Sequence, residues 1–239
     1  MNFKNITIEY HYLELPAPYT YTKTIKISPA DSFLALEYSL KYTDREDFTE
    51  DELQDEGFSG EDDESWKGNI NSNWLATLEQ LLDYKPGEKA SSENECNVLV
   101  DGARIETYGN ESKWDYFIQE ITQAIYETAE WESPLSIRFC KKDSEADKAP
   151  IQQLQISFSK RSALLSPSKD IPWEHVQQLL KLYYLQEFKE GENSKKVPNL
   201  AGSFTDPSDG FWYNVKHASS GLNKTQKEKL TKAFEDIFE

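Results

Sequence analysis

Residues 112–141 read S-K-W-D-Y-F-I-Q-E-I-T-Q-A-I-Y-E-T-A-E-W-E-S-P-L-S-I-R-F-C-K, and they predict one long amphipathic helix followed by one strand. Apolar residues recur at helical spacing in the first part and form a single stripe: Trp114, Phe117, Ile118, Ile121, Ile125 and Ala129. A stripe of this kind must be covered by other elements, so we expect Ile121 and Ile125 to be fully buried. The stretch therefore locates a core, but it does not by itself indicate a chemistry.

The ends of this helix carry recognisable signals. We expect Ser112 to be its N-cap, with Asp115 at the capping-box position, and Pro134 to end it. In the predicted strand 135–141, the apolar residues Leu135, Ile137 and Phe139 alternate with Ser136, Arg138 and Cys140, which is the period of a half-buried strand. Residues 151–160 show the same alternation, so we expect them to pair back on 135–141.

The remaining elements follow from the same periodicities. Further strands are predicted at 6–15, 19–27 and 34–42, and further helices at 73–84, from Pro172, and from Asn223 with Gln226 at the capping-box position. Asp101-Gly102, between two short apolar runs, predicts a hairpin with a type I′ turn. The interpretation is an α+β fold, an antiparallel or mixed sheet with about four main helices packed on it.

The chain is interpreted as a single α+β domain, residues 1–239. The polar stretch 86–96 is the best candidate for a sub-boundary, but it is short. After the third strand, a long acidic loop is inserted at 44–65, and a short helix at 47–55 is an alternative within it. Because dense like charges repel one another, we expect this insertion to be mobile.

Charge is concentrated in one segment. The 239 residues carry a net charge of −17. Residues 44–64 hold 12 carboxylates and one arginine, a net charge of −11, which leaves −6 for the rest of the chain. Binding to nucleic-acid phosphates requires a basic face, so direct binding of this kind is not expected.

Other features argue for a cytoplasmic protein. The two cysteines, Cys96 and Cys140, are fewer than a disulfide-stabilised secreted domain usually carries, so we expect reduced thiols. The first residues lack a signal peptide's basic start and apolar run. No run is apolar enough to span a membrane, and no membrane partner is expected.

The acidic segment is the sharpest anomaly, and it leads to the first functional hypothesis. Concentrated charge steers association with a basic partner, and interspersed aromatic residues can anchor the contact. The predicted partner-binding residues are Glu50, Asp51, Glu52, Phe58 and Trp66. The alternative is a solubilising insertion between two core elements.

A second hypothesis places a small-molecule site at 206–217, where aromatic residues alternate with polar groups in the way that lines many pockets. The predicted ligand-binding residues are Asp206, Asp209, Trp212, Tyr213 and His217. The alternative here is a turn followed by a short edge strand whose aromatic residues complete the core.

Catalytic and metal-binding patterns are absent from the sequence. The three histidines, His11, His175 and His217, stand in no metal-ligand spacing, and no calcium or phosphate loop is present. We therefore expect no catalytic residue, no metal and no cofactor. The interpretation is a non-enzymatic interaction protein that binds a basic protein partner, in an immunity-like or charge-mimic role. The alternative is a small-molecule-binding domain or hydrolase-like enzyme centred on 206–217.

Overall fold

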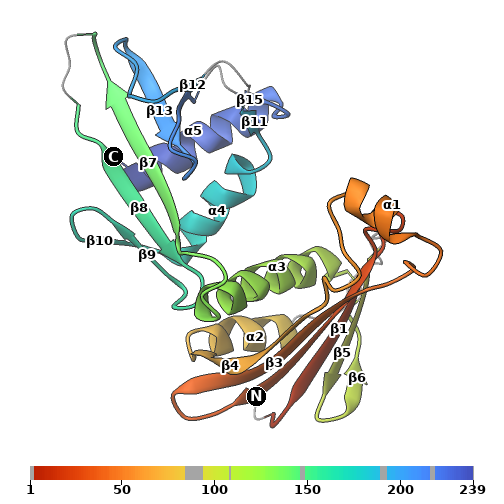
Figure 1. The fold of residues 1–239 in the computed structure, drawn as a ribbon. Helices are drawn as coiled ribbons and strands as arrows, with labels where there is room; N and C mark the ends of the chain where they lie inside the picture. The colour runs from red at the N-terminus through yellow and green to blue at the C-terminus, as the bar shows by residue number, and fades with distance from the viewer. Residues whose placement is uncertain are drawn as a thin grey trace. The chain divides into compact units, whose positions relative to one another are not determined.

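The computed structural model describes residues 3–83, 94–107, 109–145, 149–188, 193–215 and 219–238. These residues form five helices and two large antiparallel sheets, which confirms the predicted α+β class (Figure 1). The chain divides into two compact units, Met1–Glu132 and Ser133–Glu239. The division follows the long helix and not the polar stretch 86–96, most of which lies outside the described residues. That the two units behave as one domain stays a prediction.

The first unit is built on a six-stranded antiparallel sheet. In spatial order its strands are β4 (Glu64–Asn71), β3 (Phe33–Tyr42), β2 (Tyr21–Pro29), β1 (Ile6–Tyr12), β5 (Glu95–Val100) and β6 (Ala103–Ile105). The predicted meander of β1, β2 and β3 is present, and β4 extends it by a strand that the sequence did not predict. The acidic segment between β3 and β4 contains a helix, α1 (Glu50–Asp55).

Two helices, α2 (Trp74–Leu82) and α3 (Glu111–Thr128), cover one face of this sheet (Figure 1). Alternation along the strands turns large apolar side chains toward the helices, and the fully buried ones include Ile6, Ile8, Ile25, Ile27 and Leu34. The Trp74 and Phe117 rings meet edge to face at 5.9 Å, so the two helices are joined through aromatic packing.

Helix α3 has the predicted buried stripe but different ends. Ile121 and Ile125 are both 0% exposed, which confirms the predicted core. The N-cap is Asn110 and not Ser112, which lies inside the first turn. The helix ends at Thr128, and Glu130 then adopts a left-handed φ of 59°. The prediction that Pro134 ends the helix is wrong, because this left-handed residue turns the chain earlier.

The predicted hairpin is confirmed between β5 and β6. Asp101 and Gly102 have φ values of 49° and 84°, the positive values that a type I′ turn requires at both central positions. The Asp101 carboxylate also accepts hydrogen bonds from the N–H groups of Lys4 and Asn5 at 2.9 and 2.8 Å. The turn therefore also fixes the start of the chain beside it.

The second unit contains a seven-stranded antiparallel sheet. In spatial order its strands are β10 (Lys169–Ile171), β9 (Ser162–Leu165), β8 (Gln152–Ser157), β7 (Leu135–Lys142), β13 (Gly202–Asp206), β14 (Trp212–Asn214) and β12 (Asn193–Ser194). The pairing of β8 with β7 confirms the predicted return of 151–160 on 135–141. Two short strands, β11 (Glu187–Phe188) and β15 (Ser219–Ser220), form a separate pair.

Helices α4 (Trp173–Tyr183) and α5 (Lys224–Phe238) pack on one face of this sheet (Figure 1). Phe139 of β7 meets Phe234 and Phe238 of α5 at 5.0 and 4.8 Å between ring centroids. The predicted capping box of α5 is confirmed by reciprocal bonds between Asn223 and Gln226 at 2.9 and 3.0 Å.

Candidate functional site

The acidic segment is a folded element in the described structure. Thr49 begins α1 with a complete capping box: its hydroxyl accepts from the Glu52 N–H at 3.3 Å, and the Glu52 carboxylate accepts from the Thr49 N–H at 2.8 Å. Leu53, 5% exposed, is the buried residue of this helix. Whether the segment moves stays a prediction.

Arg45, the only base in the segment, fastens it to the end of the sheet. Its guanidinium lies over the rings of Tyr42 and Phe58, 3.6 and 4.2 Å from their centroids. It also donates hydrogen bonds to three oxygens: Pro18 O at 2.9 Å, Ser59 O at 3.2 Å and Asp62 Oδ2 at 3.0 Å. The Arg45 side chain is 12% exposed, so these contacts are largely shielded from water.

This anchoring leaves most of the carboxylates in solvent. Asp62 and Glu64 are half-buried and hydrogen-bonded. The other ten of the 12 acidic residues are exposed: Asp44, Glu46, Asp47, Glu50, Asp51, Glu52, Asp55, Glu56, Glu61 and Asp63. The predicted partner-binding carboxylates at 50–52 therefore lie together in the first turn of α1, within an exposed acidic surface.

The two aromatic residues predicted to join this site occupy different places. Phe58 is half-buried against Tyr19, Tyr42 and Arg45, so it holds the segment to the sheet. Trp66 is half-buried in β4, where its ring lies over Gly68. A Cβ atom at Gly68 would come within 2.3 Å of the indole Cζ2, so only glycine leaves room for the ring in this position.

A second polar cluster in the first unit was missed from the sequence. It begins with a row across the helix-covered face of the sheet: Cys96, Tyr10, Lys23, Leu40 and Glu64. Burial lowers the pKa of Lys23 to about 8, although the charge of Glu64 acts in the opposite direction. The signal was available, because Lys23 holds an inward position in the alternating strand between Tyr21 and Ile25.

Glu64 closes this row by accepting two phenol hydrogen bonds. Tyr126 of α3 and Tyr38 of β3 both donate to Glu64 Oε2, at 2.6 and 3.0 Å. Burial raises the pKa of both tyrosines well above the usual range, so they remain neutral donors at physiological pH. The acidic segment therefore ends in a carboxylate that ties β4 to α3.

Replacing Lys23 by methionine is expected to stabilise the protein by about 1–2 kcal/mol at pH 7. Below pH 8 both folded and unfolded chains hold the proton, so the native state carries a poorly solvated charge. Between the folded pKa of about 8 and the unfolded value of 10.5 the unfolded chain binds more protons, so wild-type stability rises with pH and the advantage of the variant shrinks. Urea unfolding of the wild-type protein and the variant at pH 7 and 9.5 measures this difference in the free energy of unfolding.

The matched control for that change is Lys26→Met, on the exposed face of the same strand. We expect it to shift the free energy of unfolding by no more than about 0.5 kcal/mol at either pH. An advantage of Lys23→Met that is the same at both pH values would contradict the assigned cause.

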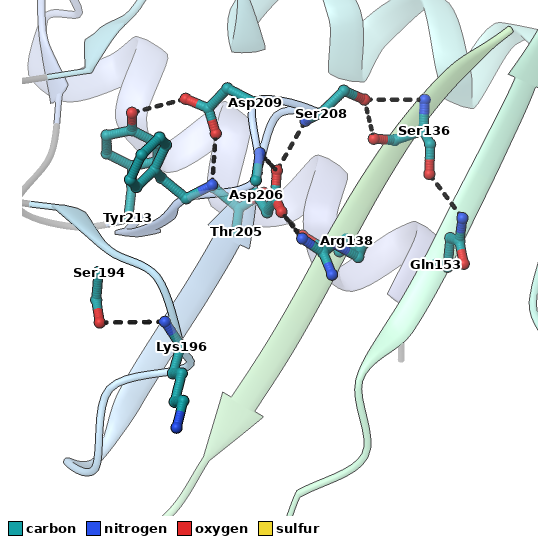
Figure 2. A network of polar contacts seen from close by, with 12 residues as sticks. Ser136, Arg138, Gln153, Ser194, Lys196, Thr205, Asp206, Ser208, Asp209 and Tyr213 are labelled. Carbon is teal, nitrogen blue, oxygen red and sulfur yellow. Dashed lines mark hydrogen bonds and ion pairs between the residues drawn. The ribbon is translucent and has the colours of Figure 1, made fainter.

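In the second unit, the segment predicted as a small-molecule site forms the turn from β13 into β14 (Figure 2). Asp206 is 0% exposed, forms an ion pair with Arg138, and accepts from the N–H groups of Ser208 and Gly210 at 2.9 and 3.2 Å. The hydroxyl of Ser208 in turn bonds the backbone of Ser136 on β7. These contacts fasten the turn to the sheet.

Of the other predicted residues, Asp209 lies in the turn, and Trp212 and Tyr213 lie on opposite faces of β14. Trp212, 3% exposed, packs with Cys140 and Phe204. Tyr213 points to the opposite face, and its hydroxyl donates to Asp209 Oδ2 at 2.7 Å. Strand β14 lies between β13 and β12, so it is an interior strand. His217 lies outside the described residues, and ligand binding at this segment stays a prediction.

Comparison with known proteins supplies no functional assignment. No protein-family model, curated protein or solved structure matches this chain. Within the described ranges, no group of three or more His, Cys, Asp and Glu side chains is placed to hold a metal ion. In the same ranges, no helix is long and apolar enough to cross a membrane.

Proposed function

We propose that this protein is a non-enzymatic interaction protein that binds a basic protein partner through the acidic segment 44–64. The observation that supports this proposal most directly is the set of ten exposed carboxylates carried by an anchored element. Charge at this density attracts a basic surface from a distance and raises the rate of encounter. A partner of this kind suits an immunity-like neutraliser or a protein that mimics the charge of a nucleic acid.

Anchoring adds to what charge alone provides. A disordered acidic tail must be ordered when it binds, and this ordering reduces affinity. Here the capping box of α1, the buried Leu53 and the stacked Arg45 supply contacts within the segment and to the sheet, which would reduce the ordering that binding requires. The same contacts also argue against an insertion that serves only solubility, since solubility requires no fixed arrangement.

The test neutralises the first turn of α1 without changing its shape. In Glu50→Gln/Asp51→Asn/Glu52→Gln the amide at 52 retains the oxygen that the capping box uses. We expect association with a basic partner to slow by about three- to tenfold at low salt, with a flatter salt dependence and a dissociation rate changed less than about twofold. Capture from a native lysate identifies the partner, and surface plasmon resonance measures both rates.

The control variant carries the same three chemical changes at exposed sites of the second unit: Glu174→Gln/Glu235→Gln/Asp236→Asn. It has the same net charge as the test variant. An equal loss of association rate in both variants would assign the effect to total charge, and an unchanged rate in both would leave the segment as a solubilising insertion.

A further inference from the structure

The strand that follows the acidic segment forms an open edge of the first sheet. Strand β4 is eight residues long, Glu64–Asn71, and stands first in the strand order. Proteins usually shorten, cover or twist such edges, because unpaired backbone groups invite another strand. The outward side of β4 therefore presents a row of backbone groups that could pair with another strand.

Hydrogen bonds on the neighbouring strands show which groups of β4 point outward. Bonds from Ala30 N to Phe33 O at 2.9 Å and from Thr43 N to Thr20 O at 3.0 Å place the odd-numbered residues of β3 in the ladder with β2. The even-numbered residues of β3 therefore bond to the even-numbered residues of β4. The odd-numbered residues of β4 turn their N–H and C=O groups to the open side: Ser65, Lys67, Asn69 and Asn71.

These outward groups are free to pair. All four residues are exposed, and in the described part of the chain no other strand, turn or side chain is bonded to the backbone of Ser65, Lys67 or Asn69. The Lys67 ammonium forms an ion pair with Glu37 at 2.5 Å, so its charge is balanced on the sheet face. The half-buried Trp66 ring, lying over Gly68, provides an apolar surface at the same edge.

The charges beside the open edge of β4 indicate which kind of partner segment it can bind. The exposed acidic surface reaches the start of β4, through Glu61 and Asp63. We propose that β4 accepts an extended, lysine- or arginine-rich segment of a protein partner as an added strand. Main-chain bonds at the outward residues supply affinity, the carboxylates select basic side chains, and Trp66 contacts an apolar side chain of the added strand. This inference rests on the proposed function and names the form in which the basic partner is recognised.

The edge is tested by a pair of variants at a neutral position. Asn69→Pro removes one outward N–H but leaves the ladder with β3 intact, since edge strands tolerate proline where the N–H faces solvent. Gly68 before it accepts the backbone restriction that proline imposes. Asn69→Val removes the same amide side chain and keeps the N–H, so it is the matched control. Equal thermal unfolding temperatures establish that both variants are folded.

The probes are two labelled octapeptides of alternating lysine and valine, one unmodified and one N-methylated on alternate residues. Fluorescence anisotropy is expected to show about tenfold tighter binding of the unmodified peptide to the wild-type protein and to Asn69→Val, which corresponds to about two main-chain hydrogen bonds. In Asn69→Pro, which lacks one of the outward N–H groups, the preference for the unmodified peptide should fall to about threefold. Equal, salt-sensitive binding of both peptides to the wild-type protein would overturn the added strand and leave the acidic docking surface standing.

Two further measurements test the proposed function itself and the possibility that β4 pairs with a second copy of this chain. If Glu50→Gln/Asp51→Asn/Glu52→Gln retains wild-type affinity for both peptides, the proposed function fails. Light scattering distinguishes the remaining occupant, a second copy of this chain paired through β4. A dimer that Asn69→Pro converts to a monomer would assign the edge to self-association and overturn the proposal, whereas a wild-type monomer that binds the unmodified peptide supports it.

Discussion

Replacing Ile121 by alanine is expected to lower the free energy of unfolding by about 2–5 kcal/mol. Ile121 is 0% exposed and lies midway along α3, which covers the sheet of the first unit. The truncation removes apolar surface from the core and leaves a cavity that the helix and sheet can fill only partly. Urea unfolding followed by circular dichroism measures the loss.

The control is Gln119→Ala on the exposed side of the same helix, which should change stability by no more than about 0.5 kcal/mol. A loss from Ile121→Ala no larger than that of the control would contradict the packing of α3. The experiment also addresses the one-domain prediction. A single wild-type transition that moves as a whole supports one cooperative domain, whereas two transitions, of which only one moves, would assign independent stability to Met1–Glu132 and Ser133–Glu239.

Elements with a strong local sequence pattern were predictable from the sequence. The stripe that contains Ile121 and Ile125 spans the whole of α3, and the Asp101-Gly102 turn allows few conformations other than the hairpin observed. The ends of α3 were not predictable in the same way. Asn110 and Ser112 are both acceptable N-caps, and a left-handed Glu130 has no strong sequence signal.

Strand β4 was hidden by its composition, whereas helix α1 lies within the range 47–55 that was given as an alternative to a loop. Only Trp66 and Ile70 are large apolar residues in Glu64–Asn71, and the inward position between them is Gly68, so alternation is nearly invisible. In α1 the apolar signal is reduced to Leu53, and the capping box at Thr49 and Glu52 is the better indicator. Charge repulsion favoured a loop in the interpretation, whereas the contacts of one largely shielded arginine, Arg45, favour a folded segment.

The sequence predicted the charge of the candidate site but not the contacts that position it. The carboxylates at 50–52 are visible in the sequence, but the partners that position the segment are distant along the chain. Tyr126 and Glu64 are 62 residues apart, and Arg45 reaches the carbonyl of Pro18, 27 residues away. Contacts across such separations depend on strand order and register, which a single sequence does not specify.

Replacing Arg45 by alanine is expected to open the acidic segment while the sheet stays folded. The change removes two ring contacts and three hydrogen bonds, and it leaves the half-buried Asp62 without its cation. The lost ring contacts and hydrogen bonds together cost about 2–3 kcal/mol. Hydrogen exchange of the amides in 45–62 should accelerate, whereas those of β1 and β2 should not. Arg45→Lys keeps the charge but loses the planar fork, so it should fall between the two.

Arg45→Ala also distinguishes the effect of the segment's charge on partner binding from the effect of its anchored arrangement. Removal of Arg45 takes away the only base among the 12 carboxylates, so the segment becomes more negative. If charge alone governed binding, Arg45→Ala would associate faster with a basic partner and bind it more tightly. If the anchored arrangement matters, the open segment must be reordered on binding, so dissociation should accelerate and affinity should fall by about tenfold. We expect the second result, and tighter binding by Arg45→Ala in surface plasmon resonance would contradict a preformed acidic surface.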